Sequence, residues 1–151
     1  MTDDDPSAGP STLLHATTVD VDGKGLLIVG PSGSGKSALA LQLMALGARL
    51  VSDDQTVVSL ESAKLVARAP QSIAGRIEAR GVGILRADPA PQTHLVAAID
   101  MGQVESRRLP KPRLFQHAFI ALPCLNKVDA PYFPAAVLQY LKGGRLNPDE
   151  L

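Results

Sequence analysis

The sequence predicts an α/β domain with a mixed, β-rich core. Residues 25–46 run from an apolar strand-like segment through a glycine-rich loop into a stretch of good helix formers. Much of the remaining chain divides into short apolar runs separated by turn-forming residues, a pattern typical of strands. A second helix-like stretch lies near the C-terminus. The chain has 151 residues, the length of one compact domain, and we expect residues 12–151 to form it.

Composition excludes several classes of function. The formal net charge is zero, so nothing indicates a general affinity for nucleic acid or membranes. There is no Trp and only 3% of residues are aromatic, which argues against a base-stacking platform. The single cysteine, Cys124, suits a reducing compartment. No apolar stretch approaches membrane length and the acidic N-terminus is unlike a signal peptide, so we expect a cytoplasmic protein.

The sequence of the N-terminal part predicts a disordered tail followed by a β-hairpin. Residues 1–11 are rich in Asp, Pro and Ser and are expected to be disordered. Residues 13–21 are strand-like, and the Asp22-Gly23 pair that follows is a strong hairpin signal. This pairing places His15 beside the next strand. A lone histidine in a strand is usually structural, so His15 alone indicates little.

The glycine-rich loop has the pattern G-x-x-x-x-G-K-[ST] of a phosphate-binding loop. It follows the apolar run 25–29 and precedes the helix predicted over 38–46, with Gly47 as its stop. This is the order of elements that the motif requires. The loop reads Gly30-Pro31-Ser32-Gly33-Ser34-Gly35-Lys36-Ser37.

The residue types of the loop suit a nucleotide's phosphates. The three glycines let successive backbone N–H groups point inward, and the helix that starts near Lys36 adds the positive end of its dipole. Lys36 is placed to reach the terminal phosphates and the Ser37 hydroxyl to bind Mg²⁺. A loop that merely turns the chain is the alternative, but the flanking strand and helix favour phosphate binding.

Carboxylates follow two of the predicted strands. Asp53 and Asp54 end the strand over 49–52, where they suit a metal ligand, a catalytic base or an ordinary turn. Asp100 ends the buried strand over 94–100 and is a rival for the magnesium role. Residues 56–60 and 65–67 are expected to form a hairpin around 61–63.

Three further segments carry predictions. If 77–84 begins as a strand, Glu78 and Arg80 share a face, and the following glycines indicate a loop closely approached by other atoms. The basic, proline-broken segment 106–113 predicts an exposed loop that either meets phosphate or a partner, or is simply solvated. Residues 114–125 resemble one strand with Pro123 at an edge or end, and 134–142 a helix stopped by Gly143-Gly144.

Several of these motifs together resemble the catalytic domain of the HPr kinase/phosphorylases. The resemblance covers about residues 13–84 and consists of L-L-H-A before a hairpin, G-P-S-G-S-G-K-S, R-L-V-S-D-D and I-E-A-R-G-V-G-I, in that order. The short chain is similar to the truncated alphaproteobacterial form. The resemblance implies a phosphoenolpyruvate-carboxykinase-like fold, a homohexamer, and transfer of phosphate from ATP, with Mg²⁺, to a serine of HPr, the small carrier protein of the sugar phosphotransferase system.

The resemblance also implies roles for individual residues. Ser37 and Glu78 correspond to magnesium ligands, Asp54 to the catalytic base and His15 to an active-site histidine, while Lys36 acts on the phosphates. The family's catalytic arginine lies in a loop that is shortened here, so Arg107 and Arg108 are its candidates.

One departure from the family concerns the reverse reaction, in which inorganic phosphate attacks phosphoserine and releases pyrophosphate. The family ties it to a late loop of the type P-x-R-P-G-R, whereas residues 123–128 read P-C-L-N-K-V. Without the bidentate charge of arginine, we expect the reverse activity to be weak or absent.

Two other interpretations remain open. Residues 126–129 spell N-K-V-D, which fits the guanine-reading motif of GTPases and predicts a GTP-binding switch, but no D-x-x-G lies between Ser37 and Asn126. A small-molecule kinase or a non-catalytic ATP-binding adaptor would also use the phosphate loop.

Overall fold

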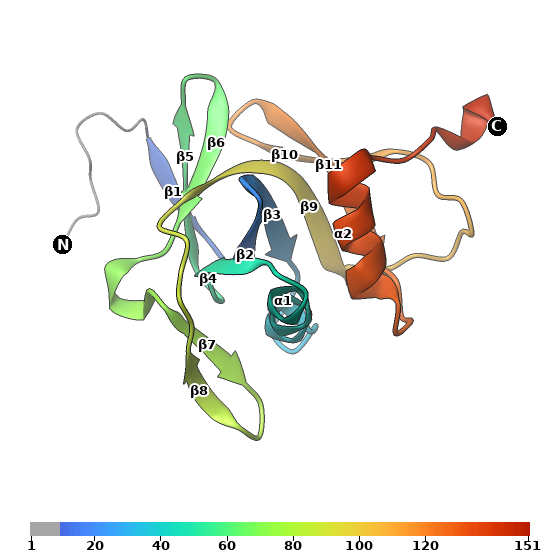
Figure 1. Cartoon of the computed structure of the whole chain (residues 1–151). Helices are drawn as coiled ribbons and strands as arrows, with labels where there is room; N and C mark the ends of the chain where they lie inside the picture. The colour runs from blue at the N-terminus through green and yellow to red at the C-terminus, as the bar shows by residue number, and fades with distance from the viewer. Residues whose placement is uncertain (1–9) are drawn as a thin grey trace.

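The computed structural model of the chain describes residues 10–151. The predicted tail, 1–11, lies outside these residues except for Pro10 and Ser11, and Ser11 begins the first strand. No helix within 10–151 is both long and apolar enough to cross a membrane. The elements, drawn in Figure 1, are β1 (Ser11–Leu14), β2 (Ala16–Val21), β3 (Lys24–Val29), α1 (Lys36–Ala45), β4 (Arg49–Ser52), β5 (Thr56–Glu61), β6 (Lys64–Arg68), η1 (Gln71–Ile73), β7 (Arg76–Ala79), β8 (Gly83–Arg86), β9 (Thr93–Val104), β10 (Arg113–His117), β11 (Ile120–Lys127), α2 (Phe133–Gly143) and η2 (Pro148–Glu150).

A nine-stranded mixed sheet organises the domain around β9. The main path is β1-β5-β6-β9-β3-β2-β4, and β11 pairs with both β9 and β10. Strands β3 and β11 each run parallel to β9, while the other pairs are antiparallel. The C-terminal ends of β3, β9 and β11 therefore meet at one edge of the sheet. The mixed, β-rich α/β fold predicted from the sequence is confirmed.

Both faces of the central strands are buried. Leu26 and Ile28 of β3 belong to the core cluster that contains α1 and α2, and Leu27 belongs to the cluster on the other face. This explains why β3 reads as a continuous apolar run rather than an alternating one. The pairing of β3 with β9 has an irregularity between Gly25 and Leu26, which shifts the alternation of side chains along β9. Leu95 and Ala98, three residues apart, therefore face the same cluster.

The two predicted early hairpins are confirmed. Asp22 and Gly23 connect β2 to β3 with φ of 52° and 86°, the left-handed backbone of a tight two-residue turn. Ser62 and Ala63 connect β5 to β6 with similar angles, although neither is a glycine.

Two predicted single strands are wrong. Residues 13–21 divide at His15, because β1 pairs with β5 whereas β2 lies between β3 and β4. Residues 114–125 form the β10–β11 hairpin, which turns at Ala118 and Phe119. No Gly, Asn or Pro marks this turn, so the sequence pattern did not reveal it. Pro123 lies in β11 before the pairing with β9 begins, where a missing N–H costs no ladder bond on that side.

The interpretation of the glycines in 77–84 also needs correction. The segment forms the β7–β8 hairpin, with Arg80 in the turn rather than in a strand. A Cβ at Gly81 or Gly83 would meet no atom within 4 Å, but their φ angles are 85° and 138°. These glycines supply backbone freedom for the turn, not room for a close neighbour.

Both predicted helices are present. Helix α1 starts at Lys36, directly after the glycine-rich loop, and Gly47, with φ of 111°, follows its end. Helix α2 has Pro134 in its first turn and ends at Gly143, one residue later than predicted, with Gly144 as its C-cap. The two helices share one core cluster, which packs them against the same face of β3 and β9.

The close approach of β3 to β9 gives a stability prediction. A Cβ at Gly25 would lie 2.6 Å from both His94 O and Thr93 Cγ2. Gly25→Ala should therefore lower the free energy of unfolding by about 1–3 kcal/mol, measured by urea denaturation. The matched control is Gly143→Ala in α2, where the added Cβ stays 3.8 Å from Gln139. It should leave stability unchanged or raise it by up to about 1 kcal/mol. Equal effects of both substitutions would contradict the steric explanation.

Candidate active site

The loop 30–37 connects β3 to the first turn of α1. Gly30, Gly33 and Gly35 have φ of 145°, 81° and 100°, a backbone that glycine adopts without strain. A Cβ at Gly30 would lie only 2.7 Å from Ser34 Oγ, so this position also requires glycine for space. The curled loop and the N-terminus of α1 together point N–H groups toward one region, as anion binding requires.

Two lysines donate hydrogen bonds to the backbone carbonyl groups of this loop. Lys36 is 6% exposed, and its Nζ donates to Gly30 O at 2.8 Å and Pro31 O at 3.2 Å. Lys127 Nζ, from the end of β11, donates to Ser34 O at 3.4 Å. Within residues 10–151, Ser34 Oγ is buried without a hydrogen-bond partner. An orphaned hydroxyl in such a loop fits a ligand oxygen.

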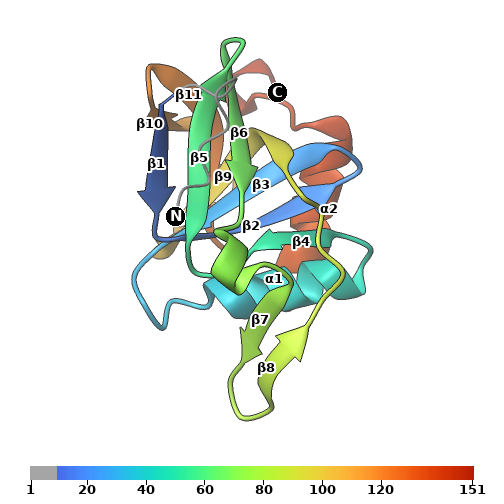
Figure 2. The same ribbon diagram turned by 90° about the vertical axis from the view of Figure 1, so that its left-hand side faces the viewer.

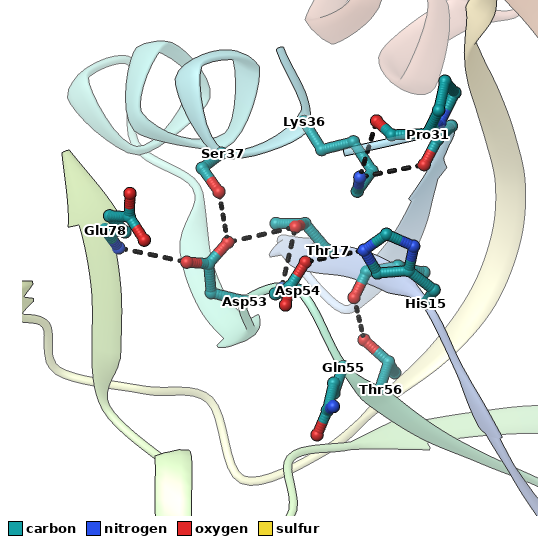
Figure 3. A network of polar contacts seen from close by, with 12 residues as sticks. His15, Thr17, Pro31, Lys36, Ser37, Asp53, Asp54, Gln55, Thr56 and Glu78 are labelled. Carbon is teal, nitrogen blue, oxygen red and sulfur yellow. Dashed lines mark hydrogen bonds and ion pairs between the residues drawn. The ribbon is translucent and has the colours of Figure 1, made fainter. Parts of the chain in front are cut away.

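Asp53 is the centre of the polar network in Figure 3. Its carboxylate is 8% exposed, and Oδ1 accepts from Ser37 Oγ at 2.6 Å and from Thr17 Oγ1 at 3.1 Å. The other oxygen, Oδ2, accepts from the backbone N–H of Glu78 at 3.0 Å. One side chain therefore connects the end of β4 to α1, β2 and β7.

Asp54 faces the other way, toward solvent. Its φ is 67° and its backbone N–H donates to Thr17 Oγ1 at 3.0 Å. His15 Nε2 lies 2.8 Å from Asp54 Oδ1, and the two side chains are 48% and 62% exposed. An ionised carboxylate only accepts, so Nε2–H donates in this pair. His15 orients a carboxylate that remains open to solvent.

A cavity of about 580 Å³ joins these groups. Its wall combines the loop and α1 with the Asp pair and the β7–β8 hairpin. It includes four of the residues predicted to act in catalysis or metal binding: Lys36, Ser37, Asp54 and Glu78. The full set of lining residues is Ser32, Gly33, Gly35, Lys36, Ser37, Ala38, Leu41, Asp53, Asp54, Glu78, Ala79 and Arg80. His15 does not line the cavity itself but bonds to Asp54, which does.

The oxygen atoms along this cavity suit Mg²⁺ carried by a nucleotide. Within 10–151, no three His, Cys, Asp or Glu side chains cluster as a metal site of protein ligands alone. In nucleotide sites, however, Mg²⁺ takes one or two protein oxygens and completes its shell with phosphates and water. Ser37 Oγ and the carboxylates of Asp53 and Glu78 line the cavity and offer such oxygens.

Three other predicted residues lie outside the wall of this cavity. Asp100 ends the β3-paired part of β9, beside Val29, and its Oδ1 accepts from Gly102 N at 2.8 Å. Arg107 and Arg108 are exposed in the loop between β9 and β10. None of the three is among the residues that line the cavity. Their roles stay predictions.

The loop that carries these arginines is fixed at its base by Glu105 and Arg113. The carboxylate accepts from Arg113 at 3.2 Å and from the backbone N–H groups of Ser106 and Arg107. Burial opposes ionisation of Glu105, but the hydrogen bonds from Arg113 and the two N–H groups outweigh it and lower the pKa of this carboxyl. The ionised Glu105 carboxylate and its donors therefore stabilise the fold at neutral pH, and this contribution is lost as pH falls through the lowered pKa of Glu105.

Comparison with known proteins places the chain in a family. The family model described as HPr Serine kinase C-terminal domain matches residues 7–90, more than half of the chain. The chain belongs to this family. The match contains every residue of the polar network, from His15 to Glu78, and ends before β9.

Individual relatives agree with the family assignment. The HPr kinase/phosphorylase of Clostridium beijerinckii is 46% identical over 76 residues, which cover 50% of this chain and 25% of the relative. That of Clostridium tetani is 44% identical over 81 residues, covering 54% and 27%. The chain thus spans about a quarter of the curated relatives it matches.

A solved structure extends the likeness to the whole fold. The Hpr(Ser) kinase/phosphatase from Coxiella burnetii matches with a TM-score of 0.74 over 87% of this chain and 88% of that one. At 24% identity the match shows the shared fold. The likeness of fold therefore covers more of the chain than residues 7–90, which the family model matches.

Sequence reasoning missed two features of the site. It treated Asp53 only as one member of a carboxylate pair, whereas the two side chains point to different surroundings and only Asp53 is buried. It did not single out Thr17, which bonds to Asp53 and to the backbone of Asp54. The sequence carried no signal for Thr17, because the chain divides at His15 and strand alternation does not continue from His15 to Thr17.

The two aspartates should differ sharply in their contribution to stability. In Asp53→Asn, one carboxylate oxygen becomes an NH₂ group, so at least one of three donors loses its acceptor. We expect the free energy of unfolding to fall by roughly 1–3 kcal/mol in urea denaturation. The control, Asp54→Asn, changes an exposed side chain and should cost less than about 1 kcal/mol. A larger loss for Asp54→Asn would contradict the network described here.

Proposed function

We propose that this protein is an ATP- and Mg²⁺-dependent serine kinase that phosphorylates an HPr-type carrier protein. One observation carries the proposal: Asp54 is exposed at the rim of the cavity that Lys36 and Ser37 also line, and His15 orients it. A buried carboxylate could not meet a protein's serine. Family membership and the relatives, which are HPr kinase/phosphorylases, support the choice of acceptor.

Asp54 would act as the general base. The hydroxyl proton of the acceptor serine passes to its carboxylate as the serine oxygen bonds to the terminal phosphorus of ATP. The bond from that phosphorus to the bridging oxygen breaks, and ADP leaves. The hydrogen bond from His15 Nε2 keeps one Asp54 oxygen engaged and leaves the other free for the hydroxyl.

The remaining groups would stabilise the transferring charge. Lys36 Nζ donates to two loop carbonyls, and it would exchange these for phosphate oxygens. The ammonium group then offsets the negative charge of the transition state. Ser37, with the carboxylates of Asp53 and Glu78, would hold Mg²⁺, which draws charge from the phosphates. Arg107 and Arg108 stay candidates for the arginine of the reaction.

We further propose that transfer in the forward direction dominates. Of the segment that replaces the arginine-rich loop, 123–128, all but the last residue lies inside β11 and is paired with its neighbours. Its only cationic side chain, Lys127, contacts Ser34 O. A second phosphate beside phosphoserine requires fixed positive charge, and this segment supplies no guanidinium group for it.

One observation keeps a GTP-dependent alternative in the test. Lys127, the lysine of N-K-V-D, lies against the phosphate loop, and β11 is two strands from β3 in the sheet. This position is compatible with contact to a nucleotide base. Family membership favours the kinase, so the nucleotide preference is measured with both ATP and GTP.

The function is tested by phosphotransfer. The purified chain, an HPr-type protein and labelled ATP with Mg²⁺ should give a phosphorylated carrier, with the label mapped to serine by mass spectrometry. Lys36→Ala should abolish transfer while the thermal unfolding midpoint shows that the protein still folds. GTP should be the poorer donor. Label that appears only on a small molecule, or full activity of Lys36→Ala, would contradict the proposal.

A second prediction separates Asp54 from its rival Asp100. Asp54→Asn should keep ATP binding but lower the turnover rate by a factor on the order of 100 or more, because the base is lost. Asp100→Asn should have a much smaller effect, since Asp100 does not line the cavity. Single-turnover kinetics and ATP titration measure the two quantities. The reverse ranking would assign the essential carboxylate to β9.

A further inference from the structure

The β7–β8 hairpin forms a small sheet of its own beside the cavity. Ile77, 1% exposed, anchors it in the core cluster that contains α1, and Leu85 packs against the same cluster. Beyond these anchors the hairpin projects away from the main sheet, as Figure 2 shows. Glu78 and Ala79 at the end of β7, with Arg80 in the turn, belong to the wall of the cavity.

Strand alternation and register define one outward face of this hairpin. Ile77 and Leu85 are opposite each other and face the core. The next positions point to the other side, where Glu78 is opposite Ile84 and Arg76 is opposite Arg86. We call Arg76, Arg86 and Ile84, with Val82 at the tip, the hairpin face, whereas Glu78 belongs to the wall of the cavity. Ile84 is 64% exposed, and Val82 at the tip is 76% exposed.

The charges on the hairpin face are unbalanced. Like charges directly opposite each other destabilise a strand pair, and Arg76 faces Arg86. The arginines that form ion pairs within 10–151 are Arg49, Arg68 and Arg113, and neither arginine of the hairpin face is among them. Two exposed guanidinium groups thus lie beside an exposed isoleucine, and neither arginine lines the nucleotide cavity.

We propose that the hairpin face docks the protein that accepts the phosphoryl group, through an acidic segment of that protein with an apolar side chain. The inference rests on the proposed function. A protein acceptor must bring its serine to Asp54, and the hairpin is the part of the cavity wall that projects beyond it. Carboxylates of the acceptor pair with Arg76 and Arg86, and its apolar side chain covers Ile84 and Val82.

The test compares acceptor binding with nucleotide binding. The variants are Arg76→Ser with Arg86→Ser, and Ile84→Ser, all at exposed positions. Each should raise the KM for an HPr-type carrier roughly tenfold and leave kcat and the Kd for ATP within about twofold. Added salt should raise the KM of the unchanged protein more than that of the double arginine variant.

Two controls match these changes elsewhere on the surface. Lys64→Ser with Lys142→Ser removes two exposed positive charges, and Leu114→Ser removes an apolar side chain that is 63% exposed on β10. Both should leave the KM for the carrier unchanged. A rise equal to that of the hairpin variants would reduce the effect to net charge or surface polarity and overturn the proposal.

Three further results would contradict the docking proposal. An unchanged KM for the carrier removes the hairpin face from docking, and a weaker Kd for ATP assigns it to the nucleotide. A change in sedimentation coefficient assigns it to contact between copies of this chain. Direct calorimetric binding of the carrier separates this inference from the proposed function. Carrier that binds through the hairpin face but receives no phosphate contradicts only the kinase proposal, whereas carrier that neither binds nor reacts contradicts both.

Discussion

The buried carboxylate of Asp53 is the interaction on which the site depends. It accepts hydrogen bonds from α1, β2 and β7, three separate elements of the fold. A buried charge is tolerated when several donors surround it, and here the donors come from separate parts of the chain. The same bonds fix Ser37, Glu78 and the strand end that carries Asp54. The positions of Ser37, Glu78 and Asp54 along the cavity therefore depend on the carboxylate of Asp53.

The local signals of the sequence predicted most of the fold. Asp22-Gly23 predicted its hairpin, the glycine-rich loop predicted β3 and α1, and Pro134 with Gly144 bounded α2. The errors arose where such signals were missing or ambiguous. Ala118 and Phe119 adopt left-handed backbone without a glycine, and this turn is fixed by the pairing of β10 with β11 rather than by local preference.

The same division applies to the site. The residues Lys36, Ser37, Asp54 and Glu78 were predicted from motifs, and they line one cavity. Which of two adjacent aspartates is buried could not be predicted, because it depends on Thr17 and on the backbone of β7, both distant in sequence. The position of the β7–β8 hairpin could not be predicted from the sequence either, since it depends on how Ile77 packs against α1.

The long strand β9 has a consequence for how this fold forms. It is the neighbour of β3 in the sheet, and it pairs Asp100 with Val29, far earlier in the chain. Contacts between such distant residues slow folding, because the intervening chain must be ordered first. During synthesis β3 keeps one unpaired, apolar edge until β9 leaves the ribosome. The segment that matches the family model ends at residue 90, before β9 begins at Thr93. The segment that matches the family model therefore holds the whole polar network but lacks the strand that pairs with β3.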